Sequence, residues 1–149
     1  MRKFVSLVFL LALCLFAGVS CRNVPKDNIA QGGGQSFDEQ MIASGNAMIS
    51  AFKAGNYQAF SRFLSDGLKR DFSGDSFDSG RRQVVESAGE VRGVRYIGKL
   101  AGPVFSNFLW AVAFSRNSGN KPVEQELLFK LTAAQDEQGA RVISFGFML

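Results

Sequence analysis

The second half of the chain contains four consecutive runs rich in β-branched and aromatic residues. These runs cover residues 91–100, 104–116, 123–132 and 140–149. Turn-forming residues separate them at 102–103, 117–120 and 136–139. Strands joined by such short connections usually pair with their neighbours in sequence. We therefore expect a four-stranded antiparallel meander.

Residues 36–89 carry helical signals instead. Ser36 and Glu39 fit a capping box, followed by a rough apolar stripe that ends at Gly55. Asn56 is suited to cap a short second helix whose end Gly67 weakens. A third helix is expected from about residue 80 to 88, after a Gly-, Ser- and Asp-rich connection over 71–79. Helices followed by strands indicate an α+β fold, with the N-terminal helices packed on one face of the meander.

The strand patterns are apolar on both faces in places. In the second run, Phe108, Trp110, Val112 and Phe114 share one face and Leu109, Ala111 and Ala113 the other. In the last run, Ile143, Phe145, Phe147 and Leu149 are expected on one face, with Val142 and Met148 opposite. The third run has a solvated face formed by Glu124, Glu126, Lys130 and Thr132. The second face of the sheet is therefore expected to meet a homodimer partner or an envelope protein, or to remain an exposed side that is tolerated.

The N-terminus has the three parts of a secretory signal peptide. Arg2 and Lys3 are followed by an uncharged stretch over 4–16 and by small residues up to position 20. We therefore assign residues 1–20 to a signal peptide that is removed. The alternative is a retained membrane span, but the uncharged run over 4–21 has 18 residues, fewer than the roughly 20 that a span needs.

The sequence Gly18-Val19-Ser20-Cys21 resembles the lipobox of bacterial lipoproteins. The resemblance implies that Cys21 becomes the acylated N-terminus and anchors the chain to a membrane. With Arg22 after the cysteine, it implies the periplasmic side of the outer membrane in a Gram-negative cell. Lipoboxes usually carry Leu where Gly18 stands, which keeps ordinary signal-peptidase cleavage as an alternative. Residues 21–35 contain Pro25 and three consecutive glycines and are expected to form a flexible tether, with a single domain over 36–149.

The layout of the domain resembles the nuclear transport factor 2-like superfamily. The similarity rests on 54–57 with Phe60 and Phe63, on 98–103, on 110–114 and on 142–147. It implies a curved sheet wrapped by helices around a cone-shaped pocket, as in cystatin-like rolls, often dimeric through the sheet. The residues that we expect to line such a pocket are Tyr57, Phe60, Tyr96, Trp110, Phe114 and Phe145. For Tyr57, Tyr96, Trp110 and Phe114, a place in the core is the alternative.

Several chemistries are disfavoured by composition. The sequence contains no histidine, and loss of the signal peptide would leave Cys21 as its one cysteine, so no catalytic metal, cofactor or thiol chemistry is expected. Removal of Arg2 and Lys3 lowers the net charge from +4 to near +2, which is too low to predict nucleic-acid binding. Five basic residues lie close together in sequence: Arg81, Arg82, Arg92, Arg95 and Lys99. We expect them to form either a solvated face or a contact with an anionic ligand or lipid headgroup.

The expected function is that of an exported, lipid-anchored and non-enzymatic module of the cell envelope that binds a ligand or a protein. The alternative is an enzyme of isomerase or dehydratase type that uses a loop carboxylate in the cone pocket. The candidate carboxylates are Asp66, Asp71, Asp75 and Asp78, whose simpler role is in helix caps and turns.

Overall fold

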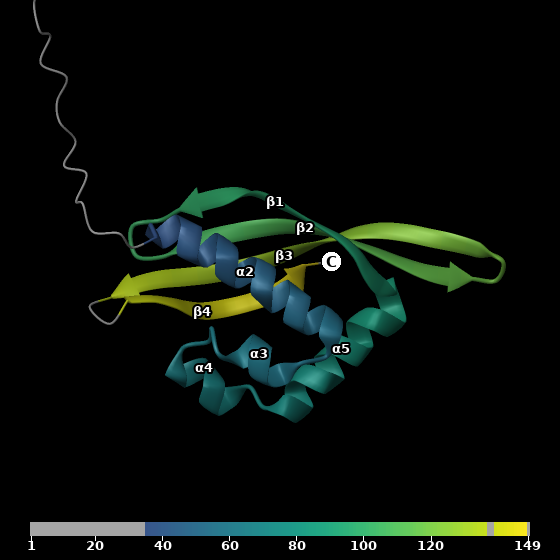
Figure 1. The fold of residues 1–149 in the computed structure, drawn as a ribbon, viewed down its shortest axis with the longest axis horizontal. Coiled ribbons are helices and arrows are strands. Elements are labelled where there is room, and N and C mark those ends of the chain that lie inside the picture. The colour runs from purple at the N-terminus through teal and green to yellow at the C-terminus, as the bar shows by residue number, and fades with distance from the viewer. Residues whose placement is uncertain (1–34, 137–138, 149) are drawn as a thin grey trace, which may run out of the picture. The chain divides into compact units, whose positions relative to one another are not determined.

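A computed structural model describes residues 35–136 and 139–148. The expected signal peptide, Cys21 and almost all of the tether lie outside these residues. The described part is an α+β fold in which all helices precede all strands (Figure 1). The helices are α2 (Phe37–Ala54), α3 (Tyr57–Ser61), α4 (Asp66–Asp71) and α5 (Gly74–Ala88), and the strands are β1 (Glu90–Ala101), β2 (Ser106–Ser118), β3 (Lys121–Asp136) and β4 (Gly139–Met148).

The four strands form one antiparallel sheet in the order β1-β2-β3-β4, which confirms the predicted meander. The helices gather on one face of this sheet (Figure 1). The segment between α3 and α4 reaches the edge of the sheet, where the Ser65 amide donates to the Val142 carbonyl at 2.9 Å. That contact satisfies part of the otherwise unpaired edge of β4.

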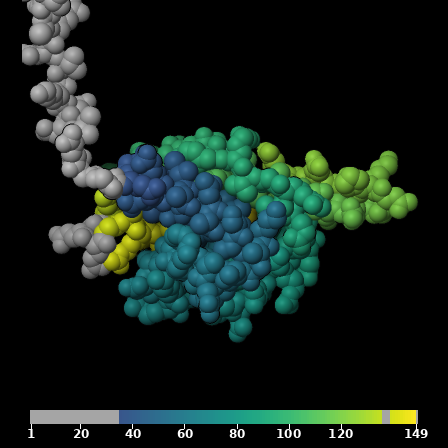
Figure 2. Space-filling model, viewed as in Figure 1, coloured from purple at the N-terminus to yellow at the C-terminus, as the bar shows by residue number. Residues whose placement is uncertain are grey.

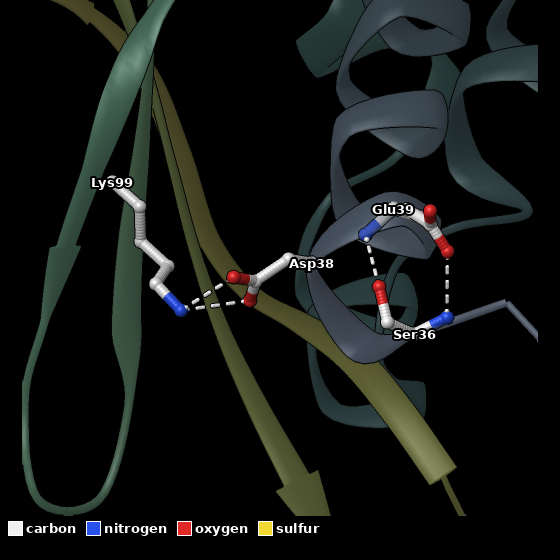
Figure 3. A network of polar contacts seen from close by, with 4 residues as sticks. All are labelled: Ser36, Asp38, Glu39 and Lys99. Carbon is white, nitrogen blue, oxygen red and sulfur yellow. Dashed lines mark hydrogen bonds and ion pairs between the residues drawn. The ribbon is translucent and has the colours of Figure 1, made fainter. Parts of the chain in front are cut away.

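Helix α2 begins and ends at the predicted residues. The Ser36 amide donates to the Glu39 carboxylate at 2.9 Å and the Glu39 amide donates to the Ser36 hydroxyl at 3.3 Å, which completes the capping box (Figure 3). At the other end, Gly55 adopts a φ of 67°, a left-handed conformation that glycine enters without steric cost. Local sequence therefore sets both limits of this helix.

The start of α5 differs from the prediction. The helix begins at Gly74 rather than near residue 80, and α4 forms as a separate short helix where the sequence indicated only a weakened end. The Ser73 hydroxyl accepts the Ser76 amide at 3.2 Å and so caps the helix. Phe77 is buried in the core, and burial of such a side chain contributes about 2 kcal/mol, which offsets the low helix propensity of the two glycines. Tertiary packing therefore extends the helix through a segment whose composition is typical of a loop.

The helix-facing side of β2 is the centre of the core, and it is formed by the four residues that the strand pattern placed together on one face. Phe108, Trp110, Val112 and Phe114 are fully buried beneath the helices. On the other face, Thr132 is buried, and its hydroxyl donates to the Asn107 side chain at 2.7 Å. The prediction that Thr132 belongs to the solvated face of β3 was wrong, because a neighbouring side chain replaces water as the partner of its hydroxyl.

A bulge in β4 corrects the predicted facing of its residues. Val142 pairs with Ala133 and Ser144 pairs with Thr132, so Ile143 is an extra residue without a partner. A bulge of this kind moves the residues before it to the opposite face. Val142 is consequently in the core together with Phe145 and Phe147, and Ile143 is 40% exposed. The prediction that Ile143 shares the face of Phe145 was wrong, because simple alternation does not register a bulge.

Candidate functional site

A cavity of about 220 Å³ opens between α5, the end of α2 and strand β4. Most of the side chains in its wall are aromatic rings, those of Phe52, Phe60, Phe72, Phe77, Phe129, Phe145 and Phe147. Ser76, Arg81 and Gln83 of α5 supply the polar side chains of the wall. We call this cavity the phenylalanine pocket. An apolar wall with a few polar groups is typical of a small-molecule site.

The rings of the phenylalanine pocket hold one another in place. Phe145 of β4 contacts Phe60 of α3 and Phe72 after α4, each with a 5.0 Å distance between ring centroids. Phe147 contacts Phe52 of α2 at the same distance. Both contacts of Phe145 are edge-to-face, the arrangement that the charge distribution of aromatic rings favours. The wall is therefore a packed aromatic surface in which each ring rests against its neighbours.

Arg81 joins the pocket to the end of α2. Its Nε donates to the Phe52 carbonyl at 2.8 Å and its Nη2 donates to the Lys53 carbonyl at 3.2 Å. Nη2 also lies 3.9 Å from the Glu90 carboxylate. A guanidinium satisfies the last carbonyls of a helix and interacts favourably with its negative end. Arg81 thus fixes α5 against α2 and places a positive charge at the pocket.

The six residues predicted for the pocket belong to one network of ring contacts, but they do not all line the cavity. Phe60 and Phe145 line the phenylalanine pocket. The network runs from Phe60 through Phe77, Phe52, Phe147 and Phe129 to Trp110 and Tyr96, and Phe114 joins it at Phe147. Trp110 and Phe114 are fully buried in the core, and the Trp110 indole nitrogen donates to the Asn46 side chain at 2.9 Å. These two residues support the pocket from within rather than form its surface.

The two tyrosines occupy supporting positions. The Tyr57 hydroxyl donates to the Phe72 carbonyl at 2.6 Å, so this side chain holds one wall of the pocket from outside. Tyr96 packs edge-on against Trp110 at 5.3 Å. Burial raises the pKa of the Tyr96 hydroxyl, as does the nearby Asp38 carboxylate, and Lys99 opposes them. Tyr96 therefore stays neutral at physiological pH.

The candidate carboxylates lie elsewhere. Asp66 lines a different hollow, together with Arg62 and Lys69, and its carboxylate lies 3.9 Å from the Lys69 ammonium. None of the described aspartates and glutamates lines the phenylalanine pocket. Within residues 35–136 and 139–148, no three potential ligands are grouped so that they could hold a metal ion. No helix in the same ranges has the length and apolar character needed to cross a membrane.

Three of the five basic residues that follow closely in sequence have partners inside the domain. Besides Arg81, Lys99 donates to both oxygens of Asp38 at 2.8 and 2.7 Å, and Arg95 lies 3.8 Å from Glu126. The three side chains point to different partners on α2 and β3. The structure therefore does not collect them into one anion-binding surface.

Sequence reasoning missed most of the pocket wall. Phe72, Phe77 and Arg81 fall in or beside the segment that was expected to be a connection. A helical signal was present nonetheless, since Ser73 is a suitable cap and Phe77, Val84 and Ala88 are spaced at i, i+7 and i+11. Phe52 lies in the apolar stripe of the first helix, but nothing in the sequence relates it to β4.

No family model matches the sequence, and no curated protein matches it. Solved structures with some similarity include one from Thiobacillus denitrificans described as a calcium/calmodulin-dependent protein kinase type II association domain. It has a TM-score of 0.49 and 14% identity, over 71% of this chain and 91% of the other. A SEC-C motif containing protein from Rhodopseudomonas palustris has a TM-score of 0.44 and 10% identity, over 79% of this chain and 96% of the other. Bd1075 from Bdellovibrio bacteriovorus has the same TM-score and identity, over 73% of this chain and 39% of the other.

Proposed function

We propose that this chain is an exported, lipid-anchored and non-enzymatic binding module that holds a small apolar ligand in the phenylalanine pocket. The observation that carries the proposal is the aromatic wall of a cavity of about 220 Å³. Sites for drug-sized molecules measure roughly 300–1,000 Å³. The ligand class is therefore a small apolar molecule, or one segment of a larger one such as an acyl chain or an aromatic ring.

The arrangement of the elements supports a nuclear transport factor 2-like, cone-shaped domain as part of this proposal. Helices precede a four-stranded meander and cover one of its faces, and the pocket lies between the two layers. Bulges in β1, at Val91/Gly93 and Tyr96/Gly98, increase the local bend of the sheet. Binding is favoured over isomerase or dehydratase chemistry because catalysis of that type needs a carboxylate in the pocket, and none of the described acidic residues lines it.

Membrane attachment through Cys21 is the second part of the proposal and rests on the sequence. In a Gram-negative cell, Arg22 after the cysteine favours the periplasmic side of the outer membrane. Intact mass and membrane partition of the protein expressed in a bacterium test this directly, beside a Cys21→Ser control. An unmodified soluble product would overturn the anchor and leave the pocket proposal standing.

A second candidate function, association through the open face of the sheet, is favoured by one observation. On the face opposite the helices, Ala111 is buried, Leu109, Ala113 and Leu128 are half-buried, and Met148 is exposed. Apolar surface of this extent on one sheet face suits a second copy or an envelope protein. Sedimentation equilibrium tests for the second copy, since a monomer at all concentrations would exclude a homodimer.

Binding in the pocket is tested by filling it. Gly80 lines the phenylalanine pocket, and a Cβ at this position meets no other atom within 4 Å. We expect Gly80→Leu to weaken the binding of 1-octanol at least about tenfold, because the new side chain occupies apolar volume that the probe needs. Titration of the amide chemical shifts with 1-octanol measures the affinity.

Gly67→Leu is the matched control for this experiment. Gly67 also lies in a helix, its nearest potential contact is the Ser65 hydroxyl at 4.0 Å, and it does not line the phenylalanine pocket. The control variant should bind 1-octanol like the unmodified chain. Equal affinities of both variants, with the fold retained, would contradict the proposed site.

A further inference from the structure

The end of β1 and the turn that joins it to β2 expose a group of large apolar side chains. Leu100 is 62% exposed, Val104 76% and Phe105 47%. We call these three residues the apolar tip. The Gly102 amide donates to the Phe105 carbonyl at 3.0 Å, and Pro103 restricts the backbone between them. The tip is therefore held in a tight turn that presents apolar side chains to the solvent.

The apolar tip lies beside the start of the domain. Val104, Phe105 and Phe37 line the same surface hollow, so the turn lies near the first turn of α2. The ion pair of Lys99 with Asp38, at 2.7 Å, joins the end of β1 to the same turn of α2 (Figure 3). The chain that arrives from Cys21 enters the domain at Ser36, directly before these contacts.

The length of that chain limits how far the apolar tip can lie from the anchor. Fourteen residues lie between Cys21 and Ser36 in sequence, and a glycine-containing tether of this length, as the sequence predicts, would typically span about 20 Å. An anchored acyl chain therefore holds the tip at a high local concentration next to the bilayer. Under such tethering, even a weak apolar contact with lipid becomes populated.

The opposite end of the sheet has a different character. The β2–β3 hairpin extends away from the helices (Figure 2). Its turn carries only polar residues and glycine from Arg116 to Lys121. The β1–β2 turn is thus apolar at the end where the tether enters, whereas the β2–β3 turn at the distal end is polar. This asymmetry matches an orientation with one end in the lipid interface and the other in water.

We propose that the apolar tip inserts into the surface of the bilayer that carries the Cys21 anchor and so orients the domain on the membrane. This inference rests on the proposed lipid anchor and goes beyond it, because an anchor alone leaves the domain free to rotate. Phe105 and Leu100 have the apolar character of side chains that settle at the boundary between headgroups and acyl chains. The lipid surface, rather than a protein, is the occupant because the tether brings it within reach.

The test uses the acylated protein, reconstituted into pure phospholipid vesicles. Acylation blocks the Cys21 thiol, so a single new cysteine can carry an environment-sensitive NBD fluorophore. Val104→Cys places the probe on the apolar tip, and Val123→Cys, an apolar position that is 38% exposed at the start of β3, is the matched control. Lipids with a nitroxide in the acyl chain should quench the probe at position 104 about threefold more strongly than at position 123.

The outcomes separate this inference from the lipid anchor. Intact mass first establishes whether Cys21 is acylated, and only acylated protein enters the experiment. Equal quenching at the two positions would show that the tip stays in water and would overturn the proposal. A probe at position 104 that is shielded from water in native membranes but not in pure vesicles would point to a protein partner. That result would also overturn the proposed insertion into lipid. Strong quenching at position 104 that is lost when Phe105→Ser is added would establish insertion of the tip.

Discussion

Replacing Gly45 by alanine is expected to destabilise the fold, although the same change usually stabilises a helix. Gly45 is buried in the middle of α2, and a Cβ built there would overlap the six-membered ring of Trp110. Trp110 has little room to move, since its ring contacts Tyr96 at 5.3 Å and Phe129 at 6.0 Å. Its indole nitrogen is also fixed by the hydrogen bond to Asn46.

The magnitude follows from two opposed effects. Alanine is favoured over glycine in a helix interior by about 1 kcal/mol. Overpacking of a filled core costs about 1–3 kcal/mol, and displacement of the indole adds roughly 1 kcal/mol for the lost hydrogen bond. We expect Gly45→Ala to lower the free energy of unfolding by about 2 kcal/mol in net terms, which corresponds to a fall in Tm of about 8 °C for a domain of this size.

Urea denaturation followed by far-ultraviolet circular dichroism measures this change. Gly80→Ala is the control, because Gly80 is exposed in α5 and its Cβ would meet no atom within 4 Å. That variant should be more stable than the unmodified chain by about 0.5–1 kcal/mol. If Gly45→Ala were as stable as Gly80→Ala, the close approach of α2 to Trp110 would be refuted, and with it the proposed packing of the helix on the sheet.

Three further predictions concern single polar groups. The pKa of the Tyr96 hydroxyl in the folded chain is raised above its ordinary value of 10.0, so the unfolded chain releases the hydroxyl proton at a lower pH than the folded chain. The free energy of unfolding should therefore fall as the pH rises above about 10. Denaturation curves of Tyr96→Phe should show a smaller fall over the same pH range. Tyr57→Phe removes the hydrogen bond to the Phe72 carbonyl and should lower the free energy of unfolding in urea by about 1 kcal/mol. The variant should also bind 1-octanol more weakly, which a loss of stability alone does not explain. Ser36→Ala removes one half of the capping box with Glu39 and should lower the free energy of unfolding by about 1 kcal/mol. Hydrogen exchange should become faster only in the first turn of α2. Uniformly faster exchange along the helix would contradict a local role.

The candidate site could be predicted only in part from the sequence. Phe60 and Phe145 were identified as pocket residues through the resemblance to the nuclear transport factor 2-like superfamily, which implies a pocket between the helices and the sheet. Phe72 and Phe77 were missed because their surroundings are rich in Gly, Ser and Asp, which indicates a connection when local composition alone is considered. Arg81 acts on carbonyls of α2 that are 28 and 29 positions earlier in the chain, and no local pattern contains such a contact.

Local chemistry determined the elements whose signals are complete within a few residues. The capping box at Ser36, the left-handed stop at Gly55 and the turns between strands each act over a few neighbouring residues. The sequence was therefore sufficient to predict the limits of α2 and the meander. Tertiary structure decided the start of α5, the bulge at Ile143 and the assembly of the phenylalanine pocket. In each of these, burial of a phenylalanine or a valine against a distant element outweighs a local preference of about 1 kcal/mol, and such contacts exist only after the helices have packed on the sheet.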